Sequence, residues 1–246
     1  MERWEKIERL GPEGGVYVTP QYSFGSDAML LANFAAPRGM TRVCELGTGC
    51  GVISLLWCGG PRWMRRRPME ITAVEVQPAA AALAARSVAR NGLADQIRVL
   101  CADWRALDGV LEAGSFERVV CNPPYFPAAS GGVSEDEARR IARHEDGPAA
   151  LDELCASAAR LLQNGGSFCV CHRPERLCDL LAALRRAGME PKRLQFVQQE
   201  DDGTPWLLLC EAKKGGRPGL QALPALVLRR DGAFTDAYLR IYGMRR

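Results

Sequence analysis

The fold of this 246-residue chain is decided by the stretch Val43-Cys44-Glu45-Leu46-Gly47-Thr48-Gly49-Cys50-Gly51-Val52-Ile53. An apolar run is followed by glycines at alternate positions and then by a second apolar run, which is typical of a buried strand, a tight turn and the start of a helix. Glycine permits positive φ and lets a ligand approach the backbone closely. We therefore predict a nucleotide-binding loop here, with a plain strand-to-helix turn as the alternative.

Outward from this loop, short β-branched runs alternate with stretches rich in Ala and Leu, as in a parallel sheet that helices cover on both faces. The predicted strands span residues 42–46, 71–75, 97–101, 117–121 and 167–171, and the predicted helices span residues 51–58, 78–90, 149–163 and 174–187. Two further runs, 193–198 and 206–211, flank the polar turn 201–205 and predict a closing antiparallel hairpin. The fold class is therefore α/β, with a Rossmann-like, mostly parallel and seven-stranded twisted sheet.

The chain has 47% hydrophobic residues, enough to bury one core. We expect residues 1–40 to form an N-terminal extension and residues 41–246 to form one α/β domain. Within the extension, residues 26–35 predict a helix with Ser26 or Asp27 as its N-cap. The residues after Pro218 show little periodicity and predict a short tail.

The composition excludes several classes of protein. The start of the chain alternates charged and apolar residues, unlike a secretory signal, and no stretch approaches the ~20 apolar residues of a membrane span. A soluble cytoplasmic protein without membrane contact is expected. The net charge of +3 is modest, but arginines cluster at 62–67, 139–143 and 245–246. Such clusters can neutralise phosphates, and a solvated surface is the alternative.

Most of the ten cysteines lie in apolar runs, where a buried thiol behaves as a small hydrophobe. We expect them to be reduced. One group, Cys169, Cys171, His172 and Cys178, resembles a metal site, but it lacks both a C-x-x-C pair and a second matching pair. No metal is expected.

Acidic residues end three successive predicted strands. Glu45 precedes a G-x-G-x-G loop rather than the dinucleotide G-x-G-x-x-G, and a carboxylate there disfavours a pyrophosphate and suits a cationic ligand such as a sulfonium amino acid. Glu75 occupies the position where doubly wound folds hold ribose hydroxyls. Asp103 is placed to accept a hydrogen bond from an adenine amino group, with Trp104 alongside. For Asp103, a helix N-cap is the alternative.

The run Val119-Val120-Cys121-Asn122-Pro123-Pro124-Tyr125-Phe126 ends the fourth predicted strand. Two prolines stop the strand, so the Asn122 side chain and the Pro123 carbonyl can converge as acceptors for one NH₂ group. Such bonds help a planar amine, a poor nucleophile, to become pyramidal and to carry positive charge during methylation. Tyr125 can stack on a base. A structural Asn-Pro-Pro turn is the alternative.

Together these motifs resemble the class I S-adenosylmethionine-dependent methyltransferases of the N6-adenine type. The narrower resemblance is to the bacterial family that methylates the adenosine 3′ of the anticodon in valine tRNA. It covers nearly the whole chain, through the segments Gln21 with 26–31, 45–51, 74–77, 86–93, 121–126, 142–145, 172–177 and 238–243.

The resemblance implies S-adenosylmethionine as cofactor and RNA, with tRNA foremost, as partner. It implies that Gly47, Gly49 and Gly51 contact the cofactor and that Asp27 lies near its methionine end. It also implies that Arg143 and His144, on the loop after the Asn-Pro-Pro-Tyr turn, flank the target; for His144, an exposed loop residue is the alternative. With Tyr125 and Phe126, they are the substrate-binding candidates. A monomer or a weak dimer is expected.

Asn-Pro-Pro-Tyr also serves cytosine N4 and protein glutamine, so the motif alone does not select the substrate. Glutamine methyltransferases of release factors carry a sizeable helical domain before the cofactor loop, where this chain has about forty residues. DNA-adenine enzymes usually add a recognition domain, and none fits after Gly188. A compact domain with basic loops suits structured RNA. A cofactor-binding or RNA-binding module without turnover is the rival from another class.

Overall fold

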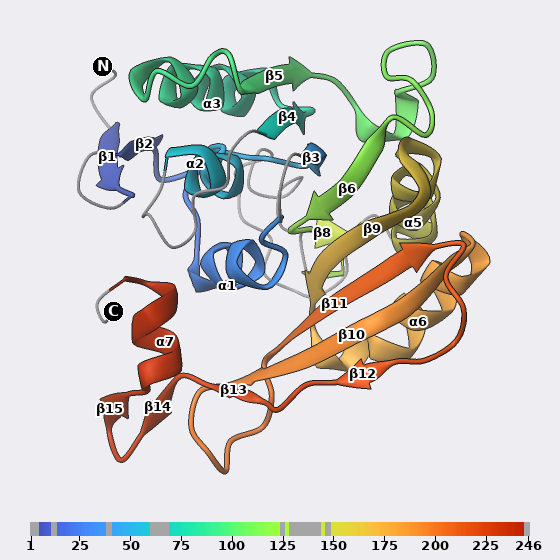
Figure 1. The fold of residues 1–246 in the computed structure, drawn as a ribbon. Coiled ribbons are helices and arrows are strands. Elements are labelled where there is room, and N and C mark those ends of the chain that lie inside the picture. Colours follow the sequence, from blue (N-terminus) through green and yellow to red (C-terminus); the bar gives the residue numbers. More distant parts are fainter. Residues whose placement is uncertain are drawn as a thin grey trace.

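The computed structural model describes residues 5–10, 14–37, 41–59, 69–123, 126–127, 144–145 and 149–243. Its main feature is a nine-stranded twisted sheet in the order β12-β10-β11-β9-β6-β3-β4-β5, with β13 beside β10 (Figure 1). The strands are β3 (Thr41–Leu46), β4 (Met69–Glu75), β5 (Ile97–Cys101), β6 (Phe116–Cys121), β9 (Leu162–His172), β10 (Met189–Gln198), β11 (Leu207–Lys214), β12 (Gln221–Ala222) and β13 (Leu226–Val227).

Strands β3, β4, β5, β6 and β9 pair in parallel, and β11 runs antiparallel to both β9 and β10. The predicted α/β class and the C-terminal hairpin are confirmed. The two short strands β12 and β13 add to the seven that the sequence predicts, because both pair in parallel with the outer edge of β10.

Helices lie on both faces of the sheet (Figure 1). They are α1 (Ser26–Phe34), α2 (Val52–Gly59), α3 (Pro78–Arg90), α5 (Ala149–Leu161), α6 (Leu177–Arg186) and α7 (Asp236–Ile241). Alternate strand residues enter two separate cores, as the two-residue period of a strand requires. Val43 packs with α1, α2 and α3, whereas Cys44 packs with α5 and α6. Both faces are therefore buried, which explains the continuous apolar character of β3.

The N-terminal segment packs against this layer. Strands β1 (Lys6–Arg9) and β2 (Gly15–Val18) form a hairpin beside α3. The backbone N–H of Tyr17 donates to the Ser87 hydroxyl at 3.0 Å, and the Arg86 guanidinium forms an ion pair with the buried carboxylate of Glu5. Val16 and Val18 join the same core as α1.

Three local predictions are wrong. The N-cap of α1 is Gly25 rather than Ser26 or Asp27, because the helix already begins at Ser26 and no side chain caps it. The helix predicted over 174–187 divides into a 3-10 turn, η2 (Pro174–Arg176), and α6. The predicted tail contains β12, β13, the small hairpin of β14 (Arg229–Arg230) and β15 (Ala233–Phe234), and α7, which Thr235 caps.

All ten cysteines are free thiols, and eight of them are buried. Burial raises the pKa of the Cys50, Cys155 and Cys169 thiols to about 12, so they stay protonated and pack as small apolar groups. Among the described residues, no group of His, Cys, Asp and Glu side chains is arranged to hold a metal ion. In the same part of the chain, the helices are too short or too polar for a bilayer crossing.

Candidate active site

The loop between β3 and α2 depends on three glycines in the left-handed region, Gly47, Gly49 and Gly51, with φ of +68°, +57° and +86°. A Cβ atom on Gly47 or Gly49 would meet nothing within 4 Å, so the backbone there borders open space. A Cβ atom on Gly51 would lie 3.3 Å from the Cβ of Ala84 on α3. The loop therefore packs closely against α3 on one side and offers bare backbone on the other.

Glu75, at the end of β4, holds this loop in place. Its side chain is buried, and its two carboxylate oxygens accept hydrogen bonds from the backbone N–H groups of Gly49 and Gln77, each at 2.9 Å. An ionised carboxylate offers about four lone-pair positions, so these two bonds leave it able to accept further hydroxyl donors. Glu75 thus lies at the rim of the loop, where the sequence predicts a ribose ligand.

Glu45 lies deeper, beneath the loop. Its carboxylate accepts hydrogen bonds from the backbone N–H of Ser54, at 3.1 Å, and from the Ser54 hydroxyl. Both residues are buried. Desolvation raises the pKa of Glu45 to about 7, and the hydrogen bonds from Ser54 oppose that rise. The carboxylate therefore faces the first turn of α2, a contact with Ser54 that sequence reasoning missed.

Asp103 follows β5 and caps the 3-10 turn η1 (Trp104–Ala106). Its Oδ1 accepts from the backbone N–H of Arg105 at 2.9 Å, and the Arg105 guanidinium forms an ion pair with Oδ2, also at 2.9 Å. These bonds lower the pKa of Asp103. The N-cap alternative considered for Asp103 is thus the observed arrangement, and the role of Arg105 had no signal in the sequence.

Asn122 follows β6 and lies between two partners that come from other elements. Its Nδ2 donates to Oδ2 of Asp27, in the first turn of α1, at 3.2 Å. The buried thiol of Cys171, on β9, donates to its Oδ1 at 3.0 Å. The Asp27 carboxylate also accepts from the backbone N–H of Ala28 at 2.9 Å. Sequence reasoning considered Cys171 as a buried core thiol, with a metal group as the alternative, and missed this contact.

The next predicted residues are described only in part. Pro123 is buried, whereas Tyr125 and Arg143 lie outside the described residues. Two short strands, β7 (Phe126–Pro127) and β8 (His144–Glu145), pair in parallel, with Phe126 opposite His144. The backbones of two predicted substrate-binding positions therefore lie side by side.

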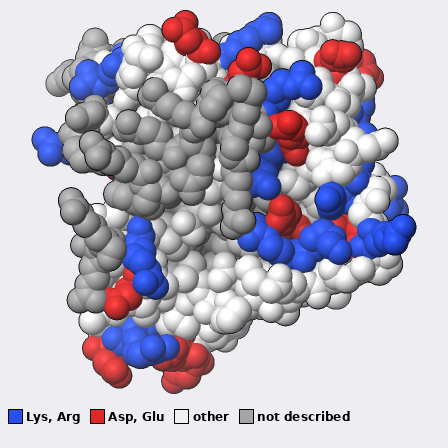
Figure 2. Space-filling model, viewed as in Figure 1, with Lys and Arg blue, Asp and Glu red and all other residues white. Residues whose placement is uncertain are grey.

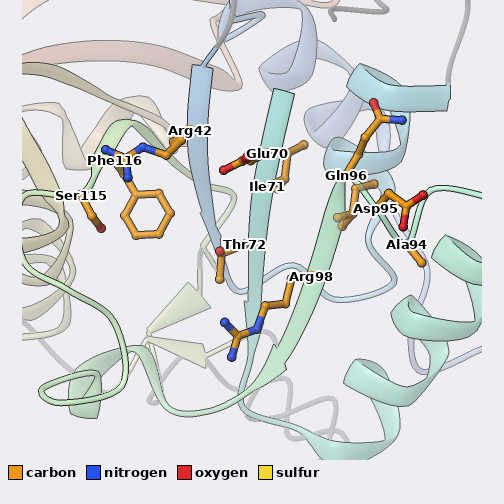
Figure 3. A pocket seen from close by; sticks show the side chains of 11 residues that line it. Arg42, Glu70, Ile71, Thr72, Ala94, Asp95, Gln96, Arg98, Ser115 and Phe116 are labelled. Atoms are coloured by element: carbon orange, nitrogen blue, oxygen red, sulfur yellow. The ribbon is translucent and has the colours of Figure 1, made fainter. Parts of the chain in front are cut away.

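These residues share one edge of the sheet, because the carboxyl ends of parallel strands meet there. Leu46 pairs with both Val74 and Cys121, and Glu75 pairs with Cys101. A separate cavity of about 340 Å³ lies toward the amino ends of the same strands, lined by residues such as Arg42, Glu70 and Phe116 (Figure 3). None of the predicted site residues that the structure describes lines this cavity.

The model of the methyltransferase small domain family matches residues 9–183. The tRNA1(Val) (adenine(37)-N6)-methyltransferase of Serratia proteamaculans is 30% identical over 219 residues, which cover 88% of this chain and 80% of the relative. The protein of the same name from Bacteroides fragilis is 29% identical over 181 residues, 74% of this chain and 73% of that relative.

Among solved structures, a predicted O-methyltransferase from Agrobacterium tumefaciens superposes with a TM-score of 0.71 at 22% sequence identity. The match covers 88% of this chain and 95% of that protein. At this identity the likeness concerns the fold alone.

Proposed function

Because this chain belongs to the methyltransferase small domain family, we propose that it transfers a methyl group from S-adenosylmethionine to the N6 amino group of an adenine in RNA. The target that we propose is adenosine 37 of a tRNA, 3′ of the anticodon, which is the position in the names of its relatives. The observation that carries the proposal is the Asn122 amide, which two partners hold at the same sheet edge as the glycine loop.

The residues around the loop fit the cofactor. S-adenosylmethionine supplies, when bound, a methyl group activated by the positively charged sulfur. Gly47, Gly49 and Gly51 would form the floor of its pocket, since the backbone of Gly47 and Gly49 borders open space. Glu75 would accept hydrogen bonds from the ribose hydroxyls, and Asp103 would lie at the adenine.

Two acidic groups suit the positively charged methionine end. Asp27 would lie close to its amino group, since this carboxylate stands beside Asn122. Glu45, the other proposed cofactor-binding residue, would also hold the start of α2 beneath the cofactor through its bond from Ser54.

The chemistry of the target follows from the acceptors after β6. The Asn122 side-chain oxygen and the Pro123 carbonyl would accept both protons of one planar NH₂ group. That arrangement favours a pyramidal nitrogen and stabilises the positive charge that develops on it. No base is needed before the methyl transfer, because the alkylated nitrogen loses a proton readily. The main contribution of the protein is to hold the nitrogen in line with the methyl group.

The wider assignments are proposals as well. Tyr125, Phe126, Arg143 and His144 would flank the flipped base, and residues 1–40 would close the cofactor pocket of the catalytic domain, 41–246. Many described arginines pair with acidic neighbours, as Arg185 does with Glu190, and both signs of charge meet on the surface (Figure 2). Phosphate contacts would therefore come chiefly from the arginine-rich segments 62–67 and 139–143. We propose a cytoplasmic monomer or weak dimer.

The test is methyl transfer from labelled S-adenosylmethionine to three candidate substrates: total tRNA, duplex DNA and a release-factor protein. We expect label in tRNA, recovered as N6-methyladenosine after digestion and mass spectrometry. Asn122→Ala should lower kcat at least a hundredfold, in line with the loss of one acceptor in a preorganised site. Gln96→Ala removes an amide at the other end of the sheet and is the matched control.

Label found in DNA, in protein or as N4-methylcytosine would contradict adenine in tRNA as the substrate, but it would still support methyl transfer to an amino nitrogen. Cofactor binding without transfer to any of the three would favour a binding module and contradict an enzyme. A Gln96→Ala variant as inactive as Asn122→Ala would remove the support for Asn122.

A further inference from the structure

We propose that Asp27 and Cys171 are positioning residues that fix the orientation of the Asn122 amide, so that its oxygen rather than its nitrogen faces the target amine. This inference rests on the proposed function and deepens it. It gives Asp27 a role in orienting Asn122, in addition to its proposed place near the cofactor. It also gives a role to the Cys171 thiol, which the sequence presents as a core residue.

The two ends of an asparagine side chain are nearly equal in shape but opposite in hydrogen bonding. In this site each end has a matching partner: the NH₂ group donates to Asp27 at 3.2 Å, and the oxygen accepts from the Cys171 thiol at 3.0 Å. A half-turn of the amide would set an oxygen against the carboxylate and an NH₂ group against the S–H. The carboxylate would then face an oxygen, and the thiol would have to change from donor to weak sulfur acceptor, so the observed orientation is favoured, chiefly through Asp27.

Both partners stand on rigid elements. Cys171 is fully buried in β9, the strand between β6 and β11, where Val170 pairs with Cys121 and Cys171 pairs with Leu209. Asp27 is fixed by its own bond to the backbone N–H of Ala28 in the first turn of α1. The amide of Asn122, which follows the end of β6, is thus held by a neighbouring strand and a helix.

The thiol contact is compatible with catalysis. An amide oxygen can accept two hydrogen bonds, so one from Cys171 does not prevent another from the target amino group. A thiol is a weak and neutral donor, and its bond draws little electron density from that oxygen. A thiol thus orients the acceptor while leaving most of its basicity for the substrate.

Three variants at buried cysteines separate positioning from packing. Cys171→Ala removes the donor, and Cys171→Ser restores one of similar size. Cys169→Ala removes an equally buried thiol two residues earlier on the same face of β9. We expect Cys171→Ala to lower kcat about two- to fivefold with little change in KM for tRNA or cofactor. Cys171→Ser should recover most of that loss, and Cys169→Ala should retain the kcat of the wild type.

A second readout does not depend on turnover. The side-chain NH₂ signals of Asn122 can be identified in the ¹⁵N NMR spectrum by their absence in Asn122→Ser. They should shift in Cys171→Ala and in Asp27→Asn, where the new amide no longer selects one orientation. They should remain near the wild-type position in Cys171→Ser and in Cys169→Ala.

Unchanged signals and kcat in Cys171→Ala would overturn the inference. Equal losses in Cys171→Ser or in Cys169→Ala would do so too, because they would point to packing alone. Wild-type protein that transfers no methyl group would defeat the proposed function, while the NMR comparison would still decide whether Asp27 and Cys171 orient Asn122.

Discussion

The carboxylate of Glu75 accepts a hydrogen bond from the backbone N–H of Gly49 at 2.9 Å, although 26 residues separate them. This bond joins the end of β4 to the centre of the glycine loop. The group proposed to hold the ribose therefore also holds the loop on which the cofactor would rest.

Replacing Glu75 by Gln should weaken cofactor binding. The two carboxylate oxygens each accept a hydrogen bond from a backbone N–H group, so the new NH₂ group would face at least one of these donors. An acceptor for the ribose hydroxyls would also be lost. We expect the Kd for S-adenosylmethionine to rise at least tenfold, about 1.4 kcal/mol, by isothermal titration calorimetry. Glu70→Gln, near the start of the same strand, is the control and should bind as the wild type does. Equal affinity in Glu75→Gln would speak against the ribose assignment.

Two glycine variants should separate stability from binding. In Gly51→Ala, the new Cβ would combine a φ of +86° with a 3.3 Å approach to Ala84, so we expect a loss of about 1–3 kcal/mol in the free energy of unfolding. Gly49→Ala has open space around its Cβ and should lose only about 1 kcal/mol, yet bind cofactor poorly. Urea unfolding and calorimetry measure the two effects. A stable Gly51→Ala protein would contradict the close packing against α3.

The buried Glu45 predicts a specific pH dependence of stability. Its pKa rises from an ordinary 4.5 to about 7 on folding, so the folded state retains a proton that the unfolded state releases. Glu45 therefore makes its full contribution to the free energy of unfolding below pH 4.5. As the pH rises to about 7, the free energy of unfolding should fall by roughly 2–3 kcal/mol. Glu45→Gln should flatten the unfolding free energy over that interval, as urea titrations at several pH values can show. If the unfolding free energies of the wild type and Glu45→Gln change with pH in parallel, Glu45 is not the source of this pH dependence.

Glu211 connects two arginines that hold the end of α1. Its carboxylate binds Arg118, at 3.3 Å, and Arg193. Arg118 also donates to the carbonyl of Ala36, and Arg193 to that of Phe34. Glu211→Gln should leave positive charge poorly compensated in a largely buried place and cost about 2 kcal/mol of unfolding free energy. Glu190→Gln breaks a pair in which the Arg185 side chain is 65% exposed, so the freed positive charge stays hydrated and the melting temperature should change little. Similar melting temperatures for the two variants would contradict the proposed importance of this cluster.

The sequence predicted the central fold because its signals are local. The glycine loop, the β-branched runs and the Ala-rich helices each follow from neighbouring residues, and β3 to β6 lie close to their predicted ranges. The C-terminal elements had no such signal. Strands β12 and β13 have two residues each and exist because β10 offers an edge, so their own side-chain pattern could not reveal them.

The same distinction applies to the site. Glu75 ends β4, Asn122 directly follows β6 and Glu45 lies in β3 just before the glycine loop, each within a recognisable motif. Cys171 is 49 residues from Asn122 and sits in an apolar run, where a thiol reads as a core residue. Ser54 and Arg105 were missed because their contacts depend on how a side chain turns, which residue spacing does not encode.

The cluster of Glu211, Arg118 and Arg193 at the end of α1 also limits how far the chain can be shortened. The family match ends at residue 183, before the strands that carry Arg193 and Glu211. A fragment cut at that boundary would keep every residue proposed for chemistry, yet would lose Arg193 and Glu211 and leave Arg118 alone at the far end of the helix that carries Asp27. An enzyme shortened by deleting the hairpin of β10 and β11 should therefore hold Asp27 less firmly. A fusion partner should follow the hairpin and not replace it.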